Sequence, residues 1–166
     1  MTTNEPARLS LPSDCEILIL RSFRAPQLQV FELWTEPRHV RGWYLCPQLS
    51  MPVCEIDFRV GGKWRFVTRE PGSGVEHPLS GEYREIARPE RIVFTQRYEP
   101  FPSGEHVVTL RFEERAGATE FTQHILHTSK ENRDAHLKSG FASGLDELFE
   151  RFDRGLAELV TPPGAA

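Results

Sequence analysis

The sequence lacks the features that would place it in a membrane or on a nucleic acid. No apolar run approaches the roughly 20 residues that a membrane-spanning helix needs, and residues 1–13 contain neither the basic nor the apolar segment of a signal peptide. Acidic residues outnumber basic ones, 24 Asp and Glu against 20 Lys and Arg, which argues against a nucleic-acid-binding surface. We therefore expect a cytoplasmic protein with no nucleic-acid or membrane partner.

Cysteine is scarce, and the histidines form no metal-binding pattern. Cys15, Cys46 and Cys54 are odd in number and include no Cys-x-x-Cys pair, so neither a disulfide framework nor a zinc knuckle is indicated. No expected helix carries a His-x-x-x-His pair, and His124 and His127, three apart on an expected strand, should point to opposite faces of a sheet. We expect no metal and no cofactor, and we expect exposed histidines in strands and loops. The six are His39, His77, His106, His124, His127 and His136.

A strand–turn–strand segment occupies residues 57–66, with Gly61 and Gly62 at the turn and an aromatic residue at every other position after it. The two glycines join strands rather than open a helix, so they predict a tight turn that requires a positive φ and not a phosphate-binding loop. A related segment follows at residues 81–86. Both favour a curved antiparallel sheet with large apolar side chains on its concave face. No Gly-x-Ser-x-Gly motif indicates a nucleophile.

The elements are expected in the order strand, two short helices, six strands and one long helix. The first strand extends from Cys15 to about Phe23, and Ala25-Pro26 begins a helix. Short turns between the later strands favour antiparallel neighbours. Those strands cover roughly 52–59, 63–70, 78–86, 91–99, 105–114 and 118–127.

The last element is expected to be a single helix over residues 129–160. Thr128 precedes Glu131 by three residues, the spacing of a capping box. Gly140 and Gly144 lie inside it, although a glycine in a helix costs about 1 kcal/mol relative to alanine. Either the sheet or a ligand approaches this face closely, or the first third of the helix is flexible. The apolar stripe of the helix is Leu137, Phe141, Leu145, Leu148, Phe149, Phe152, Leu156 and Leu159.

Strand side chains alternate between an apolar and a charged face, as in an antiparallel sheet that is covered on one side. The fold class is therefore α+β, with six to seven antiparallel strands wrapped around the C-terminal helix, and this order of elements resembles the helix-grip fold. We expect one domain over 13–161, a flexible leader over 1–12 and a tail over 162–166. The charged face includes Asp57, Arg65, Arg97, Arg111 and Glu113, and the apolar face includes Ile56, Phe58, Trp64, Phe66, Phe94, Tyr98, Val108, Leu110 and Phe112.

Many separated motifs, in order, resemble the family named for the activator of the heat-shock-protein-ninety ATPase, within the START-like, Bet-v-type (SRPBCC) superfamily. The resemblance covers about residues 14–160 and implies a helix-grip fold with a hydrophobic cavity. Trp43-Tyr44 stands where the family often has two tryptophans, and Phe141 and Leu145 also depart from its pattern. The matching residues are Arg21, Ala25-Pro26, Phe31, Trp34 to Pro37, Trp43, Cys54 to Gly62, Gly81 to Ile86, Pro89 to Arg91, Gly117 to Thr119, Ser129, Glu131 to Asp134 and Gly140 to Gly144.

Three functions remain open. The first is a binding module for a small hydrophobic or amphipathic molecule. The second is a cyclase- or hydratase-like enzyme that uses Gln96, Tyr83 or an inward histidine for proton transfer. The third is a regulator that engages a heat-shock ATPase as a chaperone partner, and a homodimer is a further alternative. The candidate ligand-binding residues are Trp43, Tyr44, Phe58, Trp64, Phe66, Tyr83, Phe94, Gln96, Tyr98, Leu110, Phe141, Leu145 and Phe149.

Overall fold

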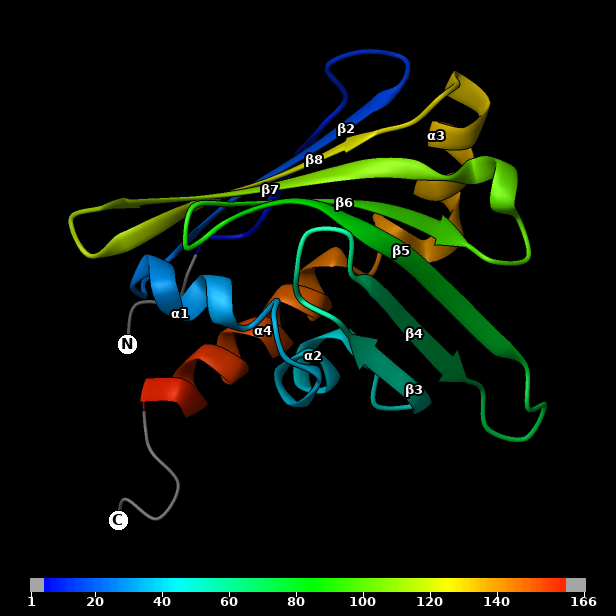
Figure 1. The fold of residues 1–166 in the computed structure, drawn as a ribbon, viewed down its shortest axis with the longest axis horizontal. Helices are drawn as coiled ribbons and strands as arrows, with labels where there is room; N and C mark the ends of the chain where they lie inside the picture. The colour runs from blue at the N-terminus through cyan, green and yellow to red at the C-terminus, as the bar shows by residue number, and fades with distance from the viewer. Residues whose placement is uncertain (1–4, 161–166) are drawn as a thin grey trace.

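One antiparallel sheet organises the chain (Figure 1), which is described here from a computed structural model covering residues 5–160. The strand order is β1-β2-β8-β7-β6-β5-β4-β3, and all neighbours are antiparallel. The strands are β1 (Arg8–Ser10), β2 (Glu16–Phe23), β3 (Ser50–Ile56), β4 (Lys63–Arg69), β5 (Glu76–Ala87), β6 (Arg91–Tyr98), β7 (His106–Arg115) and β8 (Ala118–Leu126).

Within residues 5–160 the sheet has eight strands, so the expectation of six to seven was too low. The additional strand is β1, which lies inside the segment expected to be a flexible leader. Its three residues pair with β2 in the register Arg8 opposite Leu20. Partner strand β2 supplies the hydrogen bonds that order so short a segment. Residues 1–4 of the expected leader and the expected tail 162–166 lie outside the described part of the chain.

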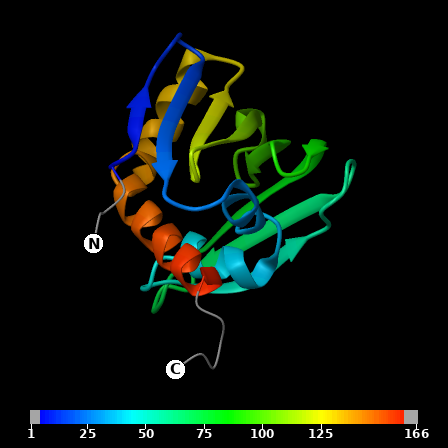
Figure 2. The same ribbon diagram turned by 90° about the vertical axis from the view of Figure 1, so that its left-hand side faces the viewer.

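The helices all lie on one side of the sheet (Figures 1 and 2). Helices α1 (Gln27–Glu32) and α2 (Pro37–Tyr44) carry the chain from β2 to the opposite edge of the sheet, where β3 begins. Pro26 and Pro37 stand at the starts of these helices, where a missing N–H costs nothing. A short 3₁₀ turn, Pro102–Gly104, joins β6 to β7.

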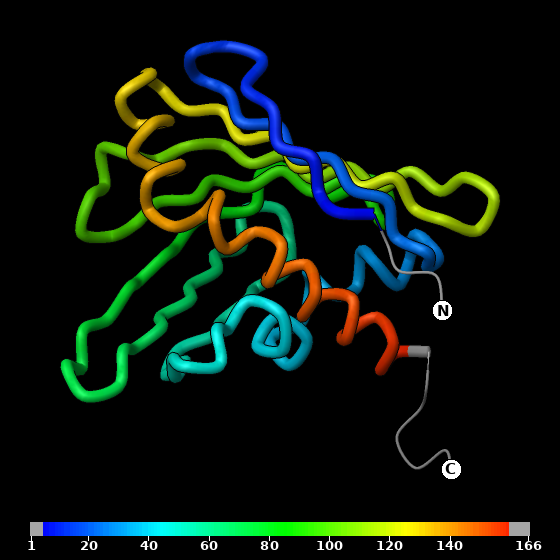
Figure 3. Tube along the Cα trace, turned by 180° about the vertical axis from the view of Figure 1, so that it is seen from behind, coloured from blue at the N-terminus to red at the C-terminus, as the bar shows by residue number. Residues whose placement is uncertain are grey.

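The C-terminal helix is interrupted, so the expectation of a single helix was wrong. Helix α3 (Lys130–His136) leads into a π-helical turn, Leu137–Phe141, and helix α4 begins at Leu145 and extends to Val160. Gly140 has φ 95°, a left-handed conformation that glycine adopts without steric cost. The glycines therefore mark a break in the helix. Seen from behind, the two parts run in succession across the sheet (Figure 3).

Ser129 caps the N-terminal end of α3, although Thr128 was the residue expected to do so. The Ser129 hydroxyl accepts a hydrogen bond from the Asn132 N–H at 3.1 Å. Thr128 instead accepts a hydrogen bond from the Asn132 side chain.

Strand β3 ends at Ile56, three residues before the expected boundary. The chain then turns, and Gly61, at φ 82°, donates its N–H to the Tyr83 carbonyl at 2.8 Å. The Tyr83 N–H in turn donates to the Gly62 carbonyl at 2.9 Å. The turn therefore docks on β5 instead of continuing as strand. The charged face is confirmed for Arg65, Arg97, Arg111 and Glu113, which are exposed on strands, whereas the exposed Asp57 lies in the turn after β3.

The core is densest where α4 crosses β2 and β8. Phe152 is fully buried and its ring centroid lies 5.0 Å from that of Phe23. Phe149 lies 5.8 Å from Phe23 and 6.1 Å from Phe121. Aromatic pairs at these separations attract one another in addition to the stabilisation from buried apolar area. This cluster anchors α4 to the sheet.

An ion pair reinforces the same anchor. The buried Arg21 guanidinium donates to both carboxylate oxygens of Asp153 at 2.6 and 2.7 Å, and it lies over the rings of Phe23 and Phe149. Removing one partner would leave a buried charge without its counter-charge.

Asp153→Ala is expected to reduce the free energy of unfolding by about 2–3 kcal/mol, because it leaves the Arg21 guanidinium unneutralised. Denaturant unfolding would measure the loss. The double variant Arg21→Met/Asp153→Leu should recover most of it, since both charges are then gone. Equal losses in the single and double variants would contradict this account of the pair. Asp146→Ala, at an exposed position of α4, is the control.

Candidate functional site

A cavity of about 770 Å³ lies between the sheet, helix α2 and the C-terminal segments. Its walls are mostly aromatic and aliphatic. Trp34, Trp43 and Tyr44 come from the first two helices and the turn between them, and Leu145 and Leu148 come from α4. Strands β4 to β8 form the opposite wall. The cavity therefore lies over the concave side of the sheet, between elements far apart in sequence.

Most of the residues expected to bind a ligand line this cavity. Eleven do so: Trp43, Tyr44, Trp64, Phe66, Tyr83, Phe94, Gln96, Tyr98, Leu110, Phe141 and Leu145. Phe58 and Phe149 are not part of the lining. Phe58 lies beyond the end of β3 and packs on Phe31 and Tyr83, whereas Phe149 lies in the core described above.

Trp64 forms a large part of the wall. Its ring lies 4.8 Å from that of Phe66 and 5.7 Å from that of Phe94 (centroid distances), and its side chain is almost completely buried. The residue opposite it on β5 is Gly81, whose missing side chain leaves room for the indole. The Trp64 Nε1–H forms no hydrogen bond with the described residues.

Two tyrosines add hydroxyl groups to the lining. Burial raises the pKa of Tyr44 and of Tyr83 well above the ordinary value, so both hydroxyls stay protonated and can donate hydrogen bonds. Gln96 lies on β6 directly opposite His106 on β7. Polar groups therefore enter the cavity from helix α2 and from strands β5 and β6.

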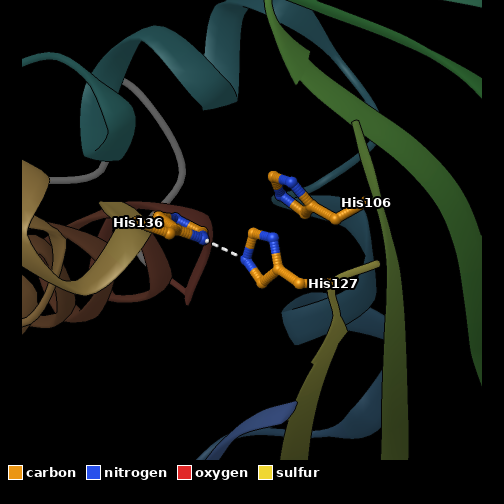
Figure 4. A group of neighbouring side chains, drawn as sticks. All are labelled: His106, His127 and His136. Carbon is orange, nitrogen blue, oxygen red and sulfur yellow. Dashed lines mark hydrogen bonds between the residues drawn. The ribbon is translucent and has the colours of Figure 1, made fainter. Parts of the chain in front are cut away.

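Three histidines converge at one end of the cavity (Figure 4). His106 begins β7, His127 follows β8 and His136 ends α3. One nitrogen from each ring lies within 4.8 Å of the others, and His127 Nε2 and His136 Nδ1 are 3.0 Å apart. The expectation of exposed strand and loop histidines was wrong for these three. His124, by contrast, points away from them and pairs with Glu16 at 2.6 Å.

All three rings favour the neutral form. Burial lowers the pKa of His136 to about 3 and of His127 to about 4, and it also lowers the pKa of His106. The neighbouring imidazoles add to the effect at His127 and His136, as does Arg133 at His127. The cluster therefore presents neutral imidazoles, each with one lone pair, at neutral pH.

The spacing rules applied to the sequence could not find this cluster, because its members come from three elements. A weaker signal was present. His106 has the same strand parity as Val108 and Leu110, which were expected on the apolar face, and the parity of His127 matches that of the buried Ile125. His136 has no such signal, because its position depends on where α3 ends.

The fold and the cavity together define a class of protein: START-like helix-grip domains of the SRPBCC superfamily, in which a curved antiparallel sheet is closed by a C-terminal helix. Residues 24–157 match the family described as "Activator of Hsp90 ATPase homolog 1-like protein". The chain belongs to that family.

Solved structures show the same fold. A protein from Rhodobacter sphaeroides is 26% identical with a TM-score of 0.83, and the match covers 91% of this chain and 98% of that one. Proteins from Mycobacterium smegmatis and Arthrobacter aurescens are each 21% identical, with TM-scores of 0.77 and 0.78. Those matches cover 93% and 96% of this chain and 98% and 94% of theirs. No curated protein matches the chain. None of the helices within residues 5–160 is long and apolar enough to cross a membrane.

Proposed function

We propose that the protein binds a small hydrophobic or amphipathic molecule in the cavity between its sheet and its C-terminal segments. The observation that carries the proposal is the lining itself. It combines a wall of aromatic rings around Trp64 with a small number of polar groups, among them the histidines around His106. Small-molecule sites typically occupy 300–1,000 Å³ and have this composition.

The distribution of polar groups favours an elongated amphipathic ligand. Gln96, His106, His127 and His136 lie together at the end of the cavity beside α3. The part beside α2 is mainly aromatic, and its charged group, Arg151, is bonded to the Trp43 carbonyl. A ligand with an apolar body and one polar end would satisfy both parts, since buried polar groups need hydrogen-bond partners.

Mass spectrometry of small molecules extracted from the purified protein is the direct test. A recurrent apolar or amphipathic compound at near-stoichiometric amount supports the proposal. A protein that carries no compound and takes up no hydrophobic dye in the folded state contradicts it.

Trp64→Leu is expected to weaken the binding of a hydrophobic dye at least several-fold, because it removes much of one wall. Phe112→Leu is the matched control, since Phe112 is buried in the core and is absent from the lining. Both variants should lose about 1–3 kcal/mol of stability through lost packing. Equal effects of the two variants on dye binding would argue that the dye reports general loosening and not this cavity.

A second candidate is a cyclase- or hydratase-like enzyme, and the convergence of three neutral imidazoles on the cavity favours it. A neutral imidazole can accept a proton from a bound molecule and return it elsewhere, which is general acid–base catalysis. Chemical change of an identified ligand by the wild-type protein, lost in His106→Gln, would support this candidate. Regulation of a heat-shock ATPase rests on the family name alone.

A further inference from the structure

We propose that His106, His127 and His136 form a binding site for a divalent transition-metal ion of the zinc class at the polar end of the cavity. The proposal stands apart from the proposed function, since the ion would bind whether or not an apolar ligand does. It differs from the sequence-based expectation because that expectation considered only histidines within one helix or strand.

A hydrogen bond to the backbone fixes the tautomer of His106. Its Nδ1 lies 3.0 Å from the Gly104 carbonyl oxygen, which can only accept a hydrogen bond, so Nδ1 carries the proton and Nε2 carries the lone pair. This Nε2 is buried and has no hydrogen-bond partner among the described residues. An N–H donated to a backbone carbonyl is how proteins orient metal-binding imidazoles.

The other two rings are hydrogen-bonded to each other. His127 Nε2 and His136 Nδ1 lie 3.0 Å apart, so one of these two nitrogens carries the proton between them, and His127 Nδ1 is buried without a partner among the described residues. When an ion enters, the shared proton moves to the other nitrogen of its ring, so both facing nitrogens can present lone pairs. Each ring stays neutral, and no net proton is released by these two residues.

The nitrogens of the three rings lie close enough together to hold one ion. Three nitrogens on one tetrahedral zinc ion at 2.0–2.1 Å lie about 3.4 Å apart. One nitrogen from each ring lies within 4.8 Å of the others, so the widest separation must close by at most about 1.4 Å. His136 precedes the π-helical turn and the left-handed Gly140, and this segment can absorb a small rotation of the ring.

The choice of metal class follows from the donors. Imidazole binds Zn²⁺, Cu²⁺ and Ni²⁺ well, whereas Mg²⁺ and Ca²⁺ prefer oxygen. Three protein ligands leave the fourth tetrahedral position to water or to a molecule in the cavity. Arg133 lies close enough to disfavour positive charge at His127, although its guanidinium also bonds Asp134 at 2.9 Å. An anionic fourth ligand, such as a carboxylate, would offset this charge.

The test uses the full chain with no histidine tag, stripped of metal. Titration with Zn²⁺ is followed by calorimetry, and titration with Co²⁺ by the visible bands of the four-coordinate ion. We expect one ion per chain. His106→Gln and His136→Gln should each weaken binding by about 100-fold or more, because loss of an outer hydrogen-bond partner alone costs 10- to 100-fold. His124→Gln is the control and should bind as the wild type does.

A second measurement uses the wild type alone, so it tests the site even if the histidine variants fail to fold. In the wild type, NMR of the histidine ring nitrogens with and without Zn²⁺ should show large shifts for His106, His127 and His136, with His124 unchanged. The proposal is wrong if the wild type binds no ion, if His124→Gln removes the binding, or if the shifted rings are not these three. Apolar dye binding measured in the same samples separates failure of the metal site from failure of the proposed function.

Discussion

Replacing Gly81 with alanine is expected to leave the protein largely unfolded. A Cβ atom at this position would lie 1.7 Å from the Thr95 backbone oxygen and 2.6 Å from Trp64 Nε1. The backbone oxygen cannot move without breaking the pairing of β5 with β6, so a shift of the indole toward the cavity would not relieve the clash. We expect a loss of more than about 4 kcal/mol, a large share of the 5–15 kcal/mol that stabilises a typical domain.

Thermal and denaturant unfolding, together with the yield of soluble protein, would measure this loss. Gly42→Ala is the matched control, since nothing lies within 4 Å of a Cβ built there and the residue lies inside helix α2. That variant should be as stable as the wild type or up to about 1 kcal/mol more stable. A Gly81→Ala protein with wild-type stability would show that β5 and β6 are not held as closely as described.

Phe149→Ala is expected to cost about 3–5 kcal/mol and to leave the affinity for a hydrophobic dye nearly unchanged. The ring of Phe149 is enclosed by Phe23, Phe121 and Phe152, and the Arg21 guanidinium lies over it at 5.0 Å. Its removal creates a hole in the core and leaves the cavity wall intact. The cost should therefore appear in the free energy of unfolding and not in binding.

Phe66→Ala should give the opposite result. Phe66 is half-buried, lines the cavity and contacts Trp64 and Tyr44. Part of its ring already faces space without partner atoms, so less contact energy is lost on truncation than in the core. We expect a smaller stability loss and clearly weaker dye binding. If Phe149→Ala were the variant with impaired binding, the division between core and cavity would be wrong.

Strand periodicity and turn residues predicted most of the sheet. Alternation of apolar and charged residues is a local property, so the sequence places Trp64 and Phe66 on the inner side and Arg65 between them on the outer side. The short strand β1 was missed because its order comes from pairing with β2 and not from its own composition.

Two of the candidate binding residues lie outside the cavity lining for the same reason. Phe58 and Phe149 both face inward, as expected, but periodicity does not say whether an inward side chain meets another side chain or an empty space. That depends on how α1 and α4 sit on the sheet, which is set by packing across the whole chain. The histidine cluster was missed for the same reason, since residues 106, 127 and 136 come together only in three dimensions.

The left-handed Gly140 divides the C-terminal segment into two helices that are held by different contacts. Helix α4 is fastened by Phe152 and by the Arg21–Asp153 pair, whereas α3 is fastened by the Ser129 cap and its own contacts. Substitutions in α3 can therefore change the polar end of the cavity while the contacts that hold α4 on the sheet stay the same.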